Sequence, residues 1–198
     1  MTKSVDFYFD FVSPYSFLAH KRILQIENDE NIKFIYKPIL LGGLHNMIGI
    51  TAPAFINPKA KFMVRDCKMV ANKFNIKFIF NSEFPINSLN LMRGLLSVSS
   101  DKKKTYINNF FDAYWQDGLN LNDQKIIINI LKKCKINKDD FQQKIKNQKI
   151  KNQLKKLTQD AFKKDIFGAP TFVVNKKIFW GQDRLEYAID EYKESNNF

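Results

Sequence analysis

The start of the chain constrains the fold most, because it predicts a strand, a helix and a second strand in close succession. Residues 5–11 alternate apolar and polar side chains and are rich in β-formers, which is typical of a core strand. Ser13 and Pro14 then predict the N-cap and the first position of a helix that runs to about Asn28. Residues 32–37 are again β-formers and predict the second strand.

The end of the chain predicts a hairpin followed by a helix. Gly168-Ala169-Pro170 interrupts regular structure, and residues 171–174 and 177–180 then predict two strands joined by a tight turn. Gly181, Gln182 and Asp183 then predict the start of a final helix. Neither end of the chain has enough strands to form a stable sheet alone, so we expect both ends to pack into one sheet.

The residues between these two halves predict helices only. Apolar side chains recur at helical spacing over residues 62–74, 89–96, 106–115 and 126–134. Asn137, with Asp140 three residues later, predicts the capped start of another helix. The order βαβ, several helices and ββα predicts an α/β protein with a thioredoxin-like fold and an all-helical insertion.

The domain boundaries follow from this order of elements. We expect residues 1–44 and 164–198 to form a discontinuous thioredoxin-like domain, and residues 45–163 to form the helical insertion domain. The chain has 198 residues, which suits one globular domain that carries a sizeable insertion.

Composition narrows the cellular setting and the kinds of partner. No apolar run is long enough to span a membrane, and the first six residues lead into the strand pattern without a signal-peptide core. Cys67 and Cys134 lie far apart in the sequence, without metal-ligand spacing, so we expect two buried thiols and no metal site. These features predict a cytoplasmic protein with no membrane partner.

The formal net charge of +12 raises the possibility of nucleic-acid binding. The lysines are scattered, however, and the densest run, Lys144 to Lys156, has helical spacing with apolar residues between the charges. A solvated helix face is the better interpretation of that run. We therefore expect no nucleic-acid partner and a mild preference for small anions.

Three short segments are candidates for a ligand site. Ser13 lies at a predicted helix N-terminus, where free N–H groups and the helix dipole stabilise an anion. Ala169-Pro170 precedes a strand, and a cis proline there would leave the Ala169 backbone able to pair with an extended ligand. Residues 180–183 precede the last helix and could hold a carboxylate and an ammonium group.

Each segment also has a purely structural interpretation. Ser13 could be an N-cap only, Pro170 a plain strand-start proline, and residues 180–183 a helix cap. In a thioredoxin-like fold, however, all three segments converge at one end of the sheet. That convergence favours a binding site.

The same motifs resemble a known family. The chain is similar to 2-hydroxychromene-2-carboxylate isomerases, which belong with kappa-class glutathione transferases and Dsb-type oxidoreductases. The resemblance covers essentially the whole chain, and its most specific motifs are Asp6-Phe7-Tyr8-Phe9-Asp10-Phe11-Val12-Ser13-Pro14-Tyr15-Ser16-Phe17-Leu18-Ala19-His20, Phe167-Gly168-Ala169-Pro170-Thr171-Phe172 and Phe179-Trp180-Gly181-Gln182-Asp183-Arg184-Leu185.

This resemblance implies a glutathione site. Ser13 matches the active-site serine of the family, where Dsb-type enzymes carry a cysteine, and it would hydrogen-bond the glutathione sulfur. Ala169 matches the residue that pairs with the cysteinyl backbone. The γ-glutamyl end would be held by four residues, namely Trp180, Gly181, Gln182 and Asp183.

The resemblance also implies substrate-binding residues in the helical insertion. Lys59 resembles a family lysine, although it could be a solvated lysine at a helix start. His45, Phe84 and Asn87 are further candidates. Phe84 lies where some family members have a tyrosine and could be core packing, and Asn87 could be a helix cap. We expect a structural role for His20.

The implied activity is a glutathione-dependent cis–trans isomerisation. The glutathione thiolate would add reversibly to a small unsaturated aromatic acid and interconvert 2-hydroxychromene-2-carboxylate and trans-o-hydroxybenzylidenepyruvate, or a related pair. The alternatives are a kappa-class-like glutathione transferase and, less favoured, a non-catalytic thioredoxin-like binding module. The family also implies a homodimer.

Overall fold

The computed structural model describes residues 4–29 and 32–195; the first three residues, on which part of the signal-peptide argument rests, lie outside this part. A four-stranded sheet with the order β2-β1-β3-β4 forms its centre. The strands are β1 (Val5–Phe9), β2 (Phe34–Pro38), β3 (Thr171–Val174) and β4 (Lys177–Trp180). β1 pairs in parallel with β2 and antiparallel with β3, and β3 and β4 form the predicted hairpin.

Alternation along β1 creates the two faces of the sheet. Phe7 and Phe9 are fully buried on one face, where the ring of Phe7 stacks on that of Phe172 from β3 at 5.4 Å. Helices α1 (Pro14–Asp29), α5 (Ser100–Trp115) and α9 (Leu185–Glu194) contribute to this larger core. Tyr8 points to the opposite face, where it packs with residues of α2 (Leu41–Ile48) and α8 (Gln148–Phe162).

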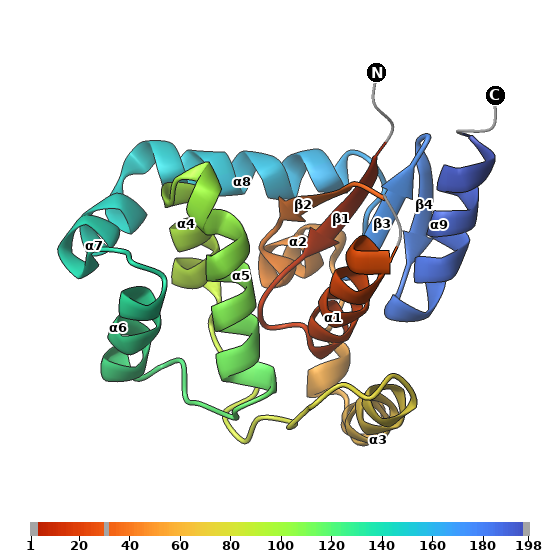
Figure 1. Cartoon of the computed structure of the whole chain (residues 1–198), viewed down its shortest axis with the longest axis horizontal. Coiled ribbons are helices and arrows are strands. Elements are labelled where there is room, and N and C mark those ends of the chain that lie inside the picture. Colours follow the sequence, from red (N-terminus) through yellow and green to blue (C-terminus); the bar gives the residue numbers. More distant parts are fainter. Residues whose placement is uncertain (1–3, 30–31, 196–198) are drawn as a thin grey trace.

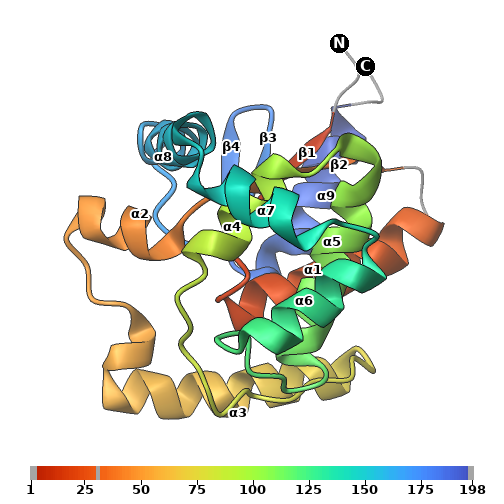
Figure 2. The same cartoon turned by 90° about the vertical axis from the view of Figure 1, so that its left-hand side faces the viewer.

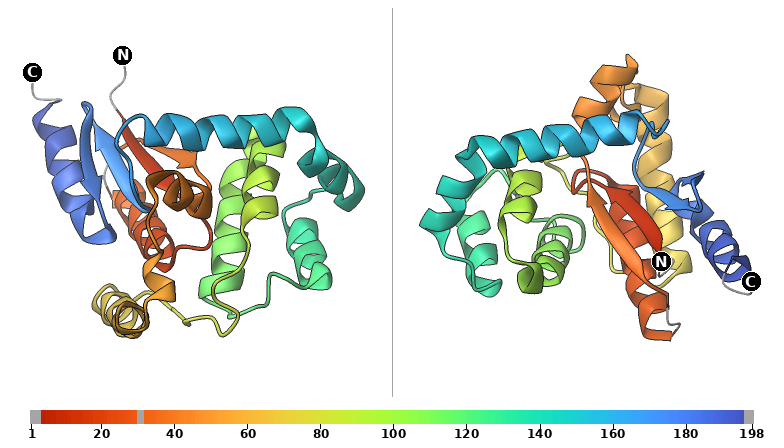
Figure 3. Two further views of the ribbon diagram at one scale, coloured as in Figure 1. Left: turned by 180° about the vertical axis from the view of Figure 1, so that it is seen from behind. Right: turned by 90° about the horizontal axis from the view of Figure 1, so that it is seen from above.

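All regular structure between β2 and β3 is helical, as expected. Besides α2, α5 and α8, it comprises α3 (Asn57–Lys73), α4 (Leu89–Ser97), α6 (Gln124–Lys133), α7 (Lys138–Lys146) and a short 3₁₀ turn. Figure 1 shows α4 to α7 as a lobe beside the sheet, with α8 running from that lobe back to the strands. Figure 2 shows α3 below the rest of the molecule, and Figure 3 shows the layers from behind and from above.

The thioredoxin-like fold with helices between its two halves is confirmed. Two expectations about elements need correction. The first strand ends at Phe9 rather than Phe11, because its parallel partner β2 ends at Pro38, opposite Phe9. The run from Lys144 to Lys156 is divided between α7 and α8 at Asn147, whose side chain accepts the N–H of Lys149 and begins a new helix.

The domain division stays a prediction. Its first boundary, after residue 44, falls within α2, and its second directly follows α8. Both cysteines are free and buried. Across the described ranges, no helix is long and apolar enough to cross a bilayer.

Candidate functional site

Ser13 lies where β1 gives way to α1. Its Oγ accepts the backbone N–H of Ser16 at 3.1 Å, and its carbonyl accepts the N–H of Phe17 at 3.1 Å. These are the bonds of an N-cap, and they hold the side chain at the positive end of the α1 dipole. Ser13 is 4% exposed, so its hydroxyl is shielded from solvent.

The second candidate segment contacts Ser13 directly. The hydroxyl of Ser13 donates a hydrogen bond of 2.9 Å to the carbonyl oxygen of Ala169. The peptide bond between Ala169 and Pro170 is cis, and the hydroxyl of Thr171 donates to the carbonyl of Gly168 at 2.8 Å. The loop before β3 is therefore fixed against the N-terminus of α1.

The third candidate segment joins the second through the backbone. The N–H of Gly181 donates to the carbonyl of Pro170 at 3.0 Å. Gly181 has a φ of 109°, a conformation that favours glycine. Trp180 lies so close over Gly168 that an added Cβ would overlap its indole nitrogen, and its ring contacts that of Phe167 at a centroid distance of 4.8 Å. The structure thus brings all three segments together.

Asp183 places a carboxylate at the rim of this assembly. Its side chain is 59% exposed and accepts a hydrogen bond from Arg184 at 2.7 Å. Gln182, one residue earlier, is buried. The segment therefore offers one solvent-facing acid next to a fixed backbone.

Arg22 contacts the third candidate segment, and the sequence analysis did not single it out. It is 3% exposed, and its guanidinium donates to the carbonyl of Gln182 at 2.9 Å and pairs with Glu186. The other side of the guanidinium lies over the ring of Phe74 at 4.1 Å. A buried cation on α1 therefore fixes the segment that precedes α9. In the sequence Arg22 looks like any surface arginine of a helix.

Asp10 is the second missed residue. It is fully buried, and its carboxylate accepts the N–H of Val12 at 3.2 Å and that of Leu41 at 2.8 Å. Burial raises the pKa of this carboxyl group, partly offset by these hydrogen bonds and one from Ser88. Asp10 therefore ties the loop before Ser13 to the starts of α2 and α4. An acid between two core phenylalanines was the available sequence signal.

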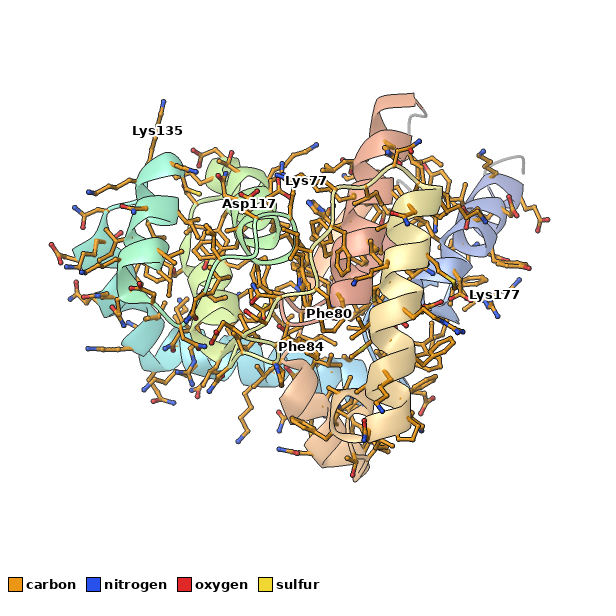
Figure 4. All side chains as sticks on the ribbon, turned by 90° about the horizontal axis from the view of Figure 1, so that it is seen from below. Lys77, Phe80, Phe84, Asp117, Lys135 and Lys177 are labelled. Carbon is orange, nitrogen blue, oxygen red and sulfur yellow. The ribbon has the colours of Figure 1, made fainter. Side chains whose placement is uncertain are left out.

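Trp115 connects the helical insertion to the same loop. Its indole N–H donates to the carbonyl of Phe11 at 2.8 Å, and the side chain is fully buried. Phe84, one of the proposed substrate residues, packs its ring on Trp115 at 5.6 Å and on Phe80 at 5.2 Å. Figure 4 shows Phe80 and Phe84 close together, seen from below.

The other proposed substrate residues are less closely tied to Ser13. Lys59 is exposed in the first turn of α3, and Asn87, which lies before the N-cap residue of α4, accepts the N–H of Leu89. His45 is half-buried in α2, where burial lowers its pKa. Among the described residues, no hydrogen bond or ring contact joins these three side chains to Ser13 or Ala169. Their role in substrate binding stays a prediction.

Comparison with known proteins gives this arrangement a family. A family model described as a DSBA-like thioredoxin domain matches residues 4–193. The chain belongs to the DsbA-like thioredoxin family. The solved structure of a 2-hydroxychromene-2-carboxylate isomerase superposes with a TM-score of 0.86, at 25% identity, over 98% of this chain and 97% of that one.

Two curated relatives also span nearly the whole of this DsbA-like chain. The 2-hydroxychromene-2-carboxylate isomerase of Sphingobium xenophagum is 26% identical over 189 residues, which cover 94% of this chain and 96% of the relative. Human glutathione S-transferase kappa 1 is 25% identical over 201 residues, which cover 94% and 89% respectively. The resemblance inferred from the sequence motifs is confirmed.

Disulfide exchange requires a thiol, and at the N-terminus of α1 this chain has the hydroxyl of Ser13. Cys67 and Cys134 are buried in helical regions, and burial raises the pKa of both thiols, that of Cys134 to about 11. Neither side chain contacts Ser13 through a hydrogen bond that the structure shows. A sulfur nucleophile at this site would have to come from a bound molecule.

Proposed function

We propose that this protein is a glutathione-dependent isomerase that interconverts 2-hydroxychromene-2-carboxylate and trans-o-hydroxybenzylidenepyruvate, or a closely related aromatic acid pair. The observation that carries the proposal is the hydrogen bond between the Ser13 hydroxyl and Ala169, at the N-terminus of α1. It joins a polar donor, a helix dipole and the backbone carbonyl of Ala169 at one point. The similarity to proteins named as this isomerase supports the choice of reaction.

The donor set fits a peptide thiol. The Ser13 hydroxyl has one proton, which the Ala169 carbonyl accepts in this structure. A ligand N–H that bonded to that carbonyl would release the Ser13 proton to donate to a thiolate nearby. The N-terminus of α1 stabilises the same negative charge. When bound, glutathione would supply the thiolate for reversible addition to the conjugated double bond of the substrate.

The segment before α9 fits the other end of the same ligand. Asp183 offers an exposed carboxylate to an ammonium group, and the bonds of Gly181 to Pro170 and Arg184 fix the backbone beside it. Arg22 keeps this backbone in place through Gln182. Trp180 shields one side with a half-exposed indole. We assign Trp180, Gly181, Gln182 and Asp183 to the γ-glutamyl group.

The aromatic acid would bind between this site and the helical insertion. Of the four candidates, Phe84 is the one whose contacts lead toward Ser13. Its ring packs on Trp115, and the Trp115 indole N–H donates to the carbonyl of Phe11 in the loop before Ser13. Lys59 would attract the substrate carboxylate, whereas His45, whose pKa is lowered by burial, and Asn87 would contribute neutral hydrogen-bonding groups. The net charge of +12 favours an anionic substrate.

The decisive experiment asks whether glutathione is a cofactor or a co-substrate. Purified enzyme receives 2-hydroxychromene-2-carboxylate in large excess over reduced glutathione, and the absorbance change of isomerisation is followed to completion. Turnover far beyond one equivalent of glutathione supports the isomerase. Consumption of one glutathione per product, with a stable conjugate in the mass spectrum, supports a kappa-class-like transferase instead, which the 25% identity to the human enzyme makes the second candidate.

Absence of glutathione uptake in calorimetry, together with salt-dependent binding to DNA or RNA, would favour a non-catalytic binding module. The homodimer and the cytoplasmic location stay predictions of the sequence analysis. Sedimentation equilibrium of the purified chain measures the first, and fractionation of the source cells measures the second.

A further inference from the structure

A hydrogen bond joins the first turn of α1 to the middle of α3. The hydroxyl of Tyr15, two residues after Ser13, donates to the carboxylate of Asp66 at 2.8 Å. Burial raises the pKa of Tyr15, so the hydroxyl keeps the proton that it donates. The next residue of α3, Cys67, is buried, and its thiol lies against the same hydroxyl. The bond therefore fixes α3 to the turn that begins with Ser13.

Helix α3 runs beside α1 in the same direction. Asp66 meets Tyr15 at the start of α1. Further along both helices, the ring of Phe74, at the C-terminal end of α3, lies 4.1 Å from the guanidinium of Arg22. These two contacts are about 10 Å apart along α1 and about 12 Å apart along α3, as expected for parallel neighbours. Figure 2 and Figure 4 both show the two helices side by side.

The start of α3 therefore extends beyond the start of α1. Lys59 precedes Asp66 by about 10 Å along the helix axis, whereas α1 begins only one residue before Tyr15. The spacing of Lys59 and Asp66 is also close to two full turns, so both lie on one side of α3. Lys59 thus lies on the side that faces α1, past the N-terminus at which an anion is stabilised. It is exposed because α1 does not extend far enough to cover it.

The projecting end of α3 has little packing to fix its direction. Among residues 57–65, only Met63 is buried, whereas the second half of the helix buries Cys67 and Ala71. Apolar contacts are not directional, so Met63 alone permits the helix to slide or rotate. The hydrogen bond of Asp66 is directional and lies at the junction of the two halves. It therefore sets the direction in which the projecting end points.

Lys59 carries a charge that is available to a ligand. The residues with which it could pair along the helix, three and four positions later, are Phe62 and Met63. The carboxylate of Asp66 lies two turns away and is bonded to Tyr15. Lysine is also unfavourable in the first turn of a helix, and no acid of that turn compensates for it in α3. A bound anion would supply the missing negative charge.

We propose that the hydrogen bond between Tyr15 and Asp66 positions Lys59 to receive the carboxylate of the aromatic acid in front of Ser13. This inference rests on the proposed function, which assigns Lys59 to that carboxylate. Tyr15 and Asp66 are positioning residues, because they act through Lys59 and do not contact the reacting atoms. The start of α1 would hold the thiolate, and the start of α3 would hold the acid to which the thiolate adds.

Steady-state kinetics of Tyr15→Phe tests the proposal. This variant keeps the ring and removes only the hydroxyl, so the fold should be retained. We expect the KM for the aromatic acid to rise about fivefold, with kcat and the KM for glutathione within about twofold of the wild type. Lys59→Gln should raise the KM for the acid to a similar extent. The double variant should stay within about twofold of Lys59→Gln alone, because both changes remove the same contact.

Rescue by a conservative variant separates positioning from simple stabilisation. Asp66→Asn keeps an oxygen that accepts the Tyr15 proton, so its KM for the acid should stay within about twofold of the wild type. Asp66→Ala should raise that KM as Tyr15→Phe does. Tyr8→Phe removes a hydrogen-bonded hydroxyl on the opposite face of the sheet, and Lys61→Gln removes an exposed charge from the other side of α3. Neither control should change the KM for the acid.

Amide hydrogen exchange provides a measurement that needs no turnover. Residues 61–65 should exchange faster in Tyr15→Phe and Asp66→Ala than in the wild type, Asp66→Asn or Tyr8→Phe. If the wild-type chain had no isomerase activity, the proposed function would fail. The exchange rates would then decide separately whether the bond positions the start of α3.

Four results would overturn the proposal. The first is an unchanged KM for the acid in Tyr15→Phe, and the second is a rise confined to the KM for glutathione, which would place Lys59 at the cofactor. The third is a full multiplication of the two effects in the double variant, which would show that Tyr15 does not act through Lys59. The fourth is unchanged exchange at residues 61–65 in both Tyr15→Phe and Asp66→Ala.

Discussion

The hydroxyl of Ser13 donates its single proton to the carbonyl of Ala169, a residue 156 positions further along the chain, at a distance of 2.9 Å. Two loops from opposite ends of the sequence are thereby joined. The same bond has a chemical consequence, because the proton must leave Ala169 before it can stabilise a thiolate. Ligand backbone at Ala169 and ligand sulfur at Ser13 are therefore expected to bind together.

Ser13→Ala should abolish most of the isomerase activity and leave the fold intact. Loss of one hydrogen bond to a charged sulfur should lower kcat about 10- to 100-fold. Loss of the N-cap should lower the unfolding free energy by about 1 kcal/mol, as urea titration would measure. Ser16→Ala is the matched control, because the Ser16 hydroxyl is buried without a partner among the described residues. A wild-type kcat for Ser13→Ala would remove the proposed role.

Gly168→Ala should weaken glutathione binding through Trp180. The added methyl group overlaps the indole nitrogen, so the half-exposed ring must move away. We expect an affinity loss of about tenfold in calorimetry, equivalent to about 1.4 kcal/mol. In a double variant that also carries Trp180→Phe, the smaller phenyl ring should leave room for the added methyl group. Its further loss of glutathione affinity, relative to Trp180→Phe alone, should therefore be smaller than the loss caused by Gly168→Ala in the wild type. Unchanged affinity in Gly168→Ala would show that the position of Trp180 does not matter.

Arg22→Lys should reduce glutathione affinity more than it reduces kcat at saturation. The shorter, non-planar ammonium cannot reach the Gln182 carbonyl and Glu186 together, so the segment before α9 loses its anchor. Steady-state kinetics should show a higher KM for glutathione with kcat within about twofold of the wild type. Glu186→Gln keeps the Arg22 bond to Gln182 and serves as the control. Equal loss in both variants would assign the effect to the ion pair.

Whether a helix or strand could be predicted from the sequence depended on the local signals that its residues carry. Strands and caps carry strong signals, so Ser13, Asn137 and the hairpin at residues 171–180 were predictable. Helix α2 was missed, because it is short, contains Gly42 and Gly43 and begins without a side-chain cap. The division at Asn147 was hidden by a helical pattern that continues on both sides.

The candidate site, too, could be predicted from the sequence only in part. Residues that would contact the ligand belong to sequence motifs, whereas residues that fix those motifs act across the fold. Arg22 donates to the carbonyl of Gln182, 160 positions away, and the side-chain carboxylate of Asp10 accepts the backbone N–H of Leu41. Such partners depend on tertiary packing and leave no periodic signal in one sequence.

Acid should destabilise the protein through His20. Its pKa in the folded chain is about 3, below the usual value of 6.5, because burial disfavours the charged ring. Its contribution to stability is therefore complete above pH 6.5 and is lost as the pH falls toward 3, by at most about 1.4 kcal/mol per pH unit. His20→Phe removes this titration and should flatten the dependence of urea-unfolding free energy on pH between 6.5 and 4 (about the range in which one imidazole titrates).

A parallel decrease in the unfolding free energies of wild type and His20→Phe as the pH falls would contradict this account. Asp10 works in the opposite direction, because its raised pKa means that the folded state takes up a proton more readily than the unfolded chain. Its titration is common to both proteins, so their difference isolates His20.

The bond from Trp115 to the Phe11 carbonyl limits how this protein can be dissected or redesigned. A minimal version that kept the sheet and discarded the helices between its halves would lose the donor that holds the turn in front of Ser13. Grafting a foreign insertion would have the same effect unless it supplied an indole at the same place. The two parts of the molecule are therefore expected to evolve as one unit, although only one of them carries the serine.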